Sequence, residues 1–176
     1  MSGPRYRSSQ ILIHWITAAL IVVLISLPYA TEAYRTILGS ARNVMVLHKS
    51  LGVLVLVLTL ARLVLRRVQA ARHADGRMAD PGRGARLGHA LLYALLLAMP
   101  VSGLLFNGKP LNLFWLVQVP PLPLGDDLRQ LARTFHGGAQ YLLFALILGH
   151  AGFALWHHYS RKDGVLTAMS FGGSRP

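Results

Sequence analysis

The sequence predicts an all-α membrane protein built as a bundle of four transmembrane helices. Of its 176 residues, 53% are hydrophobic and only 14% are charged, whereas charged residues make up about a quarter of an average soluble domain. The segments between the apolar runs are too short for a second folded domain, so residues 1–176 are expected to form one integral membrane domain in contact with lipid. Four runs reach the roughly 20 residues needed to cross a hydrocarbon core: Ile11–Ala30, Val44–Leu65, Leu87–Phe106 and Phe135–His158.

The first run must be compared with a secretory signal peptide, because Arg5 and Arg7 precede it. It is longer than the usual apolar region of such a peptide, it carries His14 near its start, and three further runs follow. We therefore expect it to be retained as a membrane span. Ser8 or Ser9 can cap its N-terminus, since a serine oxygen accepts a hydrogen bond from an unpaired backbone N–H there.

The connections between the runs differ in composition. Residues 31–43 are brief and polar, and residues 66–86, rich in Arg, Gly and Ala, are expected to have little regular structure. Pro100 is expected to kink the third run, because proline removes a backbone donor and clashes with the preceding turn. The connection before the fourth run holds four prolines around Trp115. It is expected to lie at the membrane interface as an irregular or short amphipathic segment, with Trp115 at the level of the headgroups.

The net charge of +12 is unevenly distributed along the chain. The connections after the first and third runs would lie on one side of the membrane. They carry fewer basic residues than the rest of the chain outside the runs, and these are offset by Glu32, Asp126 and Asp127. The positive-inside rule thus places both termini in the cytoplasm, and topology rather than nucleic-acid binding explains the basicity. One side of a four-span protein would collect most of the positive charge: Arg5, Arg7, Arg62, Arg66, Arg67, Arg72, Arg77, Arg83, Arg86, Arg161 and Lys162.

The chain contains no cysteine. This excludes disulfide bonds, cysteine-ligated iron–sulfur clusters and the covalent attachment of a c-type haem. Any haem in this protein must be held by axial ligands and packing alone.

Four histidines have the spacing that two haems would need: His14, His48, His136 and His150. His136 and His150 are fourteen positions apart, an offset that on a helix returns to nearly the same face, at about 100° per residue, and separates the two in depth by about 21 Å. His14 and His48 lie near the starts of the first and second runs. If the runs cross the membrane alternately, His14 is level with His150, and His48 with His136. The sequence therefore offers two bis-imidazole pockets, one near each face.

These histidines could also have roles other than haem ligation. Any one of them could simply hydrogen-bond to a neighbouring helix, although ionisable residues inside spans are rare and usually functional. A zinc or copper site explains the four histidines less well than haem does, because the ligands of such a site converge within about 2.0–2.1 Å of one ion. His136 and His150 are too far apart for that, and no run carries Asp or Glu.

Further residues could support a haem. Arg62, fourteen residues after His48, could pair with propionates of the inner haem or could be an arginine that extends to the interface; Lys49 and Arg42 could act likewise at the outer haem. Titratable side chains at the cytoplasmic boundary could protonate a quinone or orient propionates, with ordinary interfacial roles slightly favoured: His89, His157 and His158. Small residues could admit the macrocycle or allow close helix packing equally well: Gly52, Gly137, Gly138, Gly149 and Gly152.

Several segments resemble those of the bacterial cytochrome b561 family. They are Ile11–Trp15, His48–Gly52 with its continuation to Arg62, Leu92–Gly103, and the ending His157–Leu166. The resemblance covers nearly the whole chain in the expected order, although the arginine-rich and proline-rich connections match less closely. It implies a four-helix bundle in a bacterial inner membrane with two b-type haems, ligated by His14 and His150 on the inner side and by His48 and His136 on the outer side.

The resemblance also implies electron exchange with ubiquinone, and some members resemble superoxide:ubiquinone oxidoreductases with a periplasmic donor. Iron with two axial imidazoles has no open position, so outer-sphere electron transfer is its natural chemistry. Basic residues of the outer side could attract an anionic donor such as superoxide: Lys49, Arg42, Lys109, Arg129 and Arg133. Two alternatives stay open, a cytochrome subunit that anchors a partner dehydrogenase or hydrogenase, and a helical membrane protein without haem.

Overall fold

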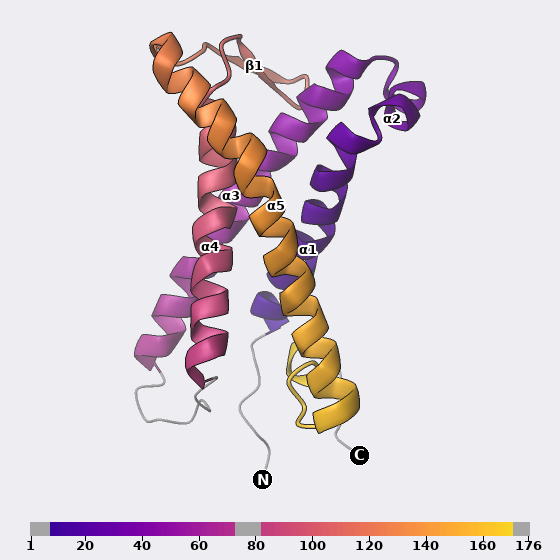
Figure 1. Ribbon diagram of the computed structural model, residues 1–176, viewed down its shortest axis with the longest axis vertical. Coiled ribbons are helices and arrows are strands. Elements are labelled where there is room, and N and C mark those ends of the chain that lie inside the picture. Colours follow the sequence, from indigo (N-terminus) through magenta and orange to yellow (C-terminus); the bar gives the residue numbers. More distant parts are fainter. Residues whose placement is uncertain (1–7, 73–81, 171–176) are drawn as a thin grey trace.

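The computed structural model describes residues 8–72 and 82–170. Four helices in these ranges are long and apolar enough to cross a membrane, so the predicted fold class is confirmed. Figure 1 shows them as the long members of an elongated bundle, with the start of the first and the end of the last at the same end. They are α1 (Ser8–Tyr29), α3 (Ala41–Arg72), α4 (Gly82–Leu105) and α5 (Asp126–Trp156).

Several helices extend beyond the apolar runs that predicted them. Helix α3 continues to Arg72 and α4 begins at Gly82, so the prediction of little regular structure over residues 66–86 is wrong at both ends of that segment. Arg, Ala, Leu and Gln are good helix formers, and arginines at a helix end can reach polar surroundings while the backbone stays helical. Residues 73–81, with His73, Arg77 and the middle of this connection, lie outside the described residues.

Helix α5 also begins earlier than the apolar run, at Asp126 instead of Phe135. Its first turn contains Asp126 and Asp127. Carboxylates stabilise this end of a helix, because the unpaired N–H groups give it a partial positive charge. The charged first turns therefore extend α5 beyond its apolar part.

We call the end of the bundle where α1 begins and α5 ends the inner end, and the opposite end the outer end (Figure 1). Both connections at the outer end contain regular structure that the sequence did not predict. Residues 31–38 form α2 (Thr31–Leu38), which ends at Gly39 with φ of 80°, a conformation that glycine adopts without strain. The proline-rich connection contains an antiparallel hairpin of β1 (Leu111–Leu113) and β2 (Val117–Val119). Its turn is built from Phe114 and Trp115, both with positive φ. The sequence predicted an irregular or short amphipathic segment here and did not indicate this hairpin.

The hairpin is attached to the start of α3. The Phe114 amide donates to Ser50 Oγ at 2.8 Å, and the Trp115 indole donates to Asn43 Oδ1 at 3.1 Å. Ser50 is fully buried beneath this contact. These bonds hold the hairpin over the outer end of the bundle, where Figure 1 shows β1.

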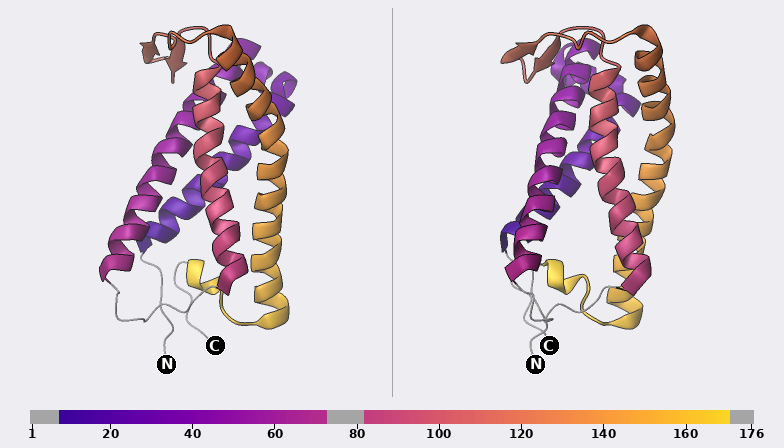
Figure 2. Two further views of the ribbon diagram at one scale, coloured as in Figure 1. Left: turned by 60° about the vertical axis from the view of Figure 1, so that its left-hand side comes forward. Right: turned by 90° about the vertical axis from the view of Figure 1, so that its left-hand side faces the viewer.

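Helices pack in chain order around the bundle. Helix α1 packs on α3, α3 on α4, and α4 on α5, while over the described residues α1 and α5 do not pack on each other along their lengths. Figure 2 shows the separation of α1 from α5 in two turned views. The buried apolar cluster of Leu27, Val44 and Leu51 joins α1 and α3 near the outer end. Pro100 lies within α4, which continues to Leu105.

After α5 the chain turns back beneath the bundle. A short π-helix, η1 (His157–Arg161), ends at Lys162 with φ of 51°, and a 3₁₀ turn, η2 (Thr167–Met169), follows. Gly164 between them also has positive φ. These two left-handed residues reverse the chain direction, so that η2 returns toward the start of α1 (Figure 2).

Candidate functional site

The inner end of the bundle brings His14 and His150 together, from α1 and α5. Their ring centroids lie 6.3 Å apart, with 73° between the ring planes. Two imidazoles on opposite sides of one metal ion need a similar separation, because two bonds of about 2 Å and two half-rings add to roughly 6 Å. Within the described part of the chain, the Nδ1 atom of His14 is buried without a hydrogen-bond partner. This ring is thus not a structural histidine bonded to its neighbours, and the pair fits a haem.

A third histidine lies beside this pair. The His89 ring from α4 is 5.4 Å from that of His150, edge to face. The sequence placed His89 on the same side of the membrane but slightly favoured an ordinary interfacial role. Its place near the start of the third run, on the same side as His150, was the signal that could have indicated the contact.

Arg62 lies at the same inner end. It interacts electrostatically with all three of these histidines, and its guanidinium group lies over the Tyr93 ring at 5.7 Å. Arg66 approaches the same ring at 5.9 Å but is exposed. Arg62 is therefore available to a negatively charged group at the inner pair.

The outer end of the bundle contains a pocket lined by His48 and His136. Its volume is about 240 Å³, compared with roughly 10–15 Å³ for a cavity that holds one water. The lining comes from all four long helices and is almost entirely aliphatic or aromatic. An apolar slot of this kind suits a flat macrocycle better than it suits a hydrated ion.

Both outer histidines are oriented by backbone carbonyls of other helices. His48 Nδ1 is 3.0 Å from the Leu24 carbonyl, and His136 Nδ1 is 2.9 Å from the Met99 carbonyl. Since a carbonyl oxygen only accepts, each Nδ1 carries the hydrogen, and each Nε2 is left with its lone pair. Metal-binding histidines are oriented in this way in proteins. The two rings thus have the tautomer that a haem iron requires.

Glycines shape the outer pocket. Gly52 of α3 and Gly103 of α4 both line it, and a Cβ on Gly103 would lie 3.3 Å from His136 Cε1. From the sequence, Gly52 could face a macrocycle or allow close helix packing equally well, whereas Gly103 stands out there only as part of a family-like segment. Four glycines of α5 have open space among the described residues at the position that a Cβ would take: Gly137, Gly138, Gly149 and Gly152.

Basic side chains surround this outer pocket. Lys49 lines it and donates to Asn107 Oδ1 at 2.8 Å. Arg133 lies over the Phe106 ring at 5.3 Å, and Phe106 contacts the His136 ring, also at 5.3 Å. Arg129 is instead bonded to the carbonyls of Leu122 and Leu124. Lys109 and Arg42 are exposed at the same end.

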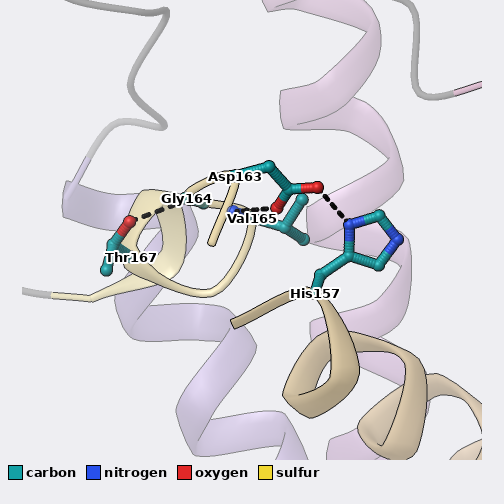
Figure 3. A network of polar contacts seen from close by, with 5 residues as sticks. All are labelled: His157, Asp163, Gly164, Val165 and Thr167. Carbon is teal, nitrogen blue, oxygen red and sulfur yellow. Dashed lines mark hydrogen bonds and ion pairs between the residues drawn. The ribbon is translucent and has the colours of Figure 1, made fainter. Parts of the chain in front are cut away.

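The end of α5, at the same end of the bundle as the start of α1, holds a polar network that the sequence did not predict (Figure 3). His157 Nδ1 donates to Asp163 Oδ2, and this bond holds the pKa of the Asp163 carboxyl below its ordinary value. His158 does not join this contact but packs edge to face on Tyr159. The sequence grouped these two histidines, whereas the structure gives only His157 of the pair a carboxylate partner among the described residues.

Among the residues that the structure describes, no group of three or more His, Cys, Asp or Glu side chains could hold a metal ion. The histidines instead form pairs from different helices, at opposite ends of the bundle. This arrangement corresponds to axial ligation of a macrocycle rather than to a zinc or copper site.

Comparison with known proteins agrees with this geometry. The chain is 28% identical to cytochrome b561 homolog 1 and 29% identical to cytochrome b561 homolog 2, both of Escherichia coli (strain K12). These alignments cover 94% of this chain and 96% and 90% of the two relatives. It is also 25% identical to the probable superoxide oxidase CybB of Yersinia pestis, over 94% of this chain and 95% of that protein.

The match to the family is broader than any single segment. Residues 5–172 match the family described as prokaryotic cytochrome b561, which includes all four long helices and all four paired histidines. Membership implies a membrane protein that binds b-type haem and transfers electrons. This chain belongs to the prokaryotic cytochrome b561 family.

Proposed function

We propose that this protein holds two b-type haems in a bacterial inner membrane and transfers electrons from a periplasmic donor to ubiquinone. His14 and His150 ligate the inner haem, and His48 and His136 ligate the outer haem. Both termini lie in the cytoplasm, as the distribution of arginines indicates. The observation that carries the proposal is the pairing of four histidines at two levels, with a spacing of 6.3 Å in the inner pair.

The residues around each pair have distinct roles. Bound haem supplies a one-electron redox centre at each level. The Leu24 and Met99 carbonyls keep the outer imidazoles in the ligating tautomer and orientation. Arg62 compensates propionate charge at the inner site, where it already interacts with His14 and His150.

The donor that fits the outer face best is superoxide. Lys49 reaches the outer pocket, and Arg133 lies one aromatic ring away from His136, so an anion is attracted toward the ligand pair. The name of the Yersinia pestis relative supports the same donor. In the complete reaction, two superoxide ions lose one electron each and become O₂. One ubiquinone takes up the two electrons and two protons to become ubiquinol.

Haem stoichiometry tests the ligand assignment. Purified protein should contain two haems per chain by pyridine haemochrome quantitation. His14→Ala and His150→Ala should lose the same haem in a reduced-minus-oxidised spectrum, and His48→Ala and His136→Ala the other. His158→Ala is the matched control, because this boundary histidine packs on Tyr159, away from both ligand pairs, and it should keep both haems. Loss of different haems in His14→Ala and His150→Ala would refute the pairing.

The donor requires a separate experiment. Pulse-generated superoxide should reduce the haems of the isolated protein, and added ubiquinone should reoxidise them. Haems that stay oxidised would refute the donor assignment. If reduction then required a partner protein that co-purifies with this chain, the protein would instead be a cytochrome subunit that serves a dehydrogenase or hydrogenase.

A further inference from the structure

The inner histidine pair spans two helices that, over the described residues, do not pack on each other along their lengths. His14 belongs to α1, which packs on α3, and His150 belongs to α5, which packs on α4. Direct packing therefore does not fix the distance between the two rings. Axial ligation of one iron tolerates little change in that distance, because the metal–nitrogen bonds have a fixed length of about 2 Å. Another element must connect α1 to α5 at the inner end.

Residues 162–170, which we call the C-terminal strap, connect these helices. On the α5 side, Asp163 accepts a hydrogen bond from His157 and, through Oδ1, one from the Val165 amide at 3.3 Å. Figure 3 shows Asp163 between these two partners, with Thr167 to their left, bonded to the Gly164 carbonyl. One carboxylate thus fixes the turn of the strap and attaches it to the end of α5.

On the α1 side, the strap is held by Trp15. The indole Nε1 donates to the Met169 carbonyl at 2.7 Å, although the two residues are 154 positions apart. Trp15 is the neighbour of His14 in the chain, and the two rings meet edge to face at 5.3 Å. The far end of the strap is therefore attached beside the inner ligand of α1.

The attachment on α5 is similarly aligned with its ligand. His157 follows His150 by seven residues, which at about 100° per residue returns to nearly the same helix face. The strap thus joins the α1 residue next to one inner ligand to the first residue of η1, about two turns after the other. The described residues contain a corresponding tie at the outer end, where the Tyr29 hydroxyl donates to Gln140 Oε1 at 3.0 Å.

We propose that the C-terminal strap sets the separation of His14 and His150, with Trp15, His157 and Asp163 as positioning residues for the inner haem. The inference rests on the haem assignment proposed above. It gives a specific role to the family-like ending of the chain, which the ligand set alone does not explain. The strap acts on the inner pair only, because His48 and His136 are oriented by carbonyls of α1 and α4.

Electron paramagnetic resonance of the oxidised haems tests the role, since the low-spin signal depends on the relative orientation of the two imidazoles. Asp163→Ala and Trp15→Phe should shift or broaden the inner signal and lower inner-haem retention by about tenfold, the usual effect of losing a residue that orients a metal-binding histidine. Asp163→Asn should restore part of the loss. The outer signal should not change. Tyr29→Phe, which removes only the outer tie, should leave the inner signal unaltered.

A second measurement does not need haem. The chain has no cysteine, so spin labels on Ser9→Cys in α1 and Ser160→Cys after α5 report one distance by pulsed dipolar spectroscopy. Removing the Asp163 carboxylate should broaden that distance distribution in haem-free protein as well. An unchanged distribution together with an unchanged inner signal would overturn the strap inference. A broadened distribution in a protein whose His14→Ala and His150→Ala variants lose no common haem would overturn the haem assignment instead.

Discussion

The Ser102 hydroxyl lies 3.0 Å from the Nδ1 atom of His136, although the two residues belong to different helices. Ser102 also donates to the Met99 carbonyl at 2.9 Å, so its lone pairs are available to the imidazole hydrogen. The same carbonyl accepts from His136. A buried serine and a backbone carbonyl thus orient the His136 ring jointly, and each contributes to the basicity of this ligand.

Ser102→Ala should weaken haem binding at the outer site and raise the potential of that haem. Removing one acceptor from the Nδ1 hydrogen makes the imidazole a poorer electron donor, and about tenfold weaker binding is expected because the Met99 carbonyl remains. Redox titration and haem-transfer kinetics measure both effects. Thr59→Val is the control, because buried Thr59 bonds to its own helix at Val55. An equal effect of the two substitutions would contradict this prediction.

Gly103→Ala should displace His136. The added Cβ would lie 3.3 Å from Cε1 and 3.6 Å from Nδ1 of that ring, and the ring cannot retreat without lengthening its bonds to Met99 and Ser102. We expect partial loss of the outer haem and an altered spectrum of what remains. Gly84→Ala in the same helix meets no described atom within 4 Å and should be neutral or slightly stabilising, since alanine favours a helix by up to about 1 kcal/mol. Full retention of haem in Gly103→Ala would refute the contact.

Lys49→Gln should slow the reaction with superoxide. One unit charge acting through several ångström of water changes an encounter rate by about two- to threefold, and the difference should disappear at high salt. Stopped-flow or pulse-radiolysis rates at several ionic strengths measure it. Arg35→Gln removes the same charge from the same side, but Arg35 is exposed and paired with Glu32 at 2.7 Å, so its rate should match the parent protein. Equal rates for all three proteins would exclude steering by Lys49.

Arg62→Gln should lower the potential of the inner haem. A nearby positive charge disfavours the oxidised iron, so removing it stabilises that state by an amount on the order of tens of millivolts. Arg66→Gln is the matched control, because Arg66 approaches the same Tyr93 ring from an exposed position. Potentiometric titration should show a clearly smaller shift for this variant. A larger shift in Arg66→Gln would reassign the role.

Acid should release the C-terminal strap only at low pH. The hydrogen bond from His157 holds the pKa of Asp163 below its ordinary 3.8, and the Arg161 charge and the Val165 amide act in the same direction. A carboxyl whose pKa is lower in the folded state than in the unfolded state stabilises the fold fully at pH values above its unfolded-state pKa. This contribution is lost as the pH falls through its folded-state pKa. The distance between labelled positions 9 and 160 should stay constant from neutral pH down to that range and broaden below it. Asp163→Asn should show no such acid transition.

The sequence predicted the parts of this molecule that depend on period and depth. Hydropathy located the four long helices, and the offset of fourteen residues from His136 to His150 within α5 placed one histidine toward each end of the bundle. The partner helices then followed from alternate crossing. These are one-dimensional properties, so a single chain is enough to predict them.

The parts that the sequence did not predict depend on individual backbone angles or on distant contacts. The hairpin turn places Phe114 and Trp115 in the left-handed region, where aromatic residues are uncommon, so no local pattern indicated it. The contact of Trp15 with Met169 joins opposite ends of the chain. Gly103 contacts His136 because α4 and α5 pack at one particular rotation, and hydropathy does not determine that rotation.

The separation of α1 from α5 has a consequence for how this protein matures. Because α1 packs on α3 and α5 packs on α4, a seam is left between α1 and α5 over the described residues. A flat apolar molecule such as haem, dissolved in the bilayer, would reach the ligand pairs through that seam. Iron bound by His14 and His150 would then join the first and the last of the long helices that the structure describes.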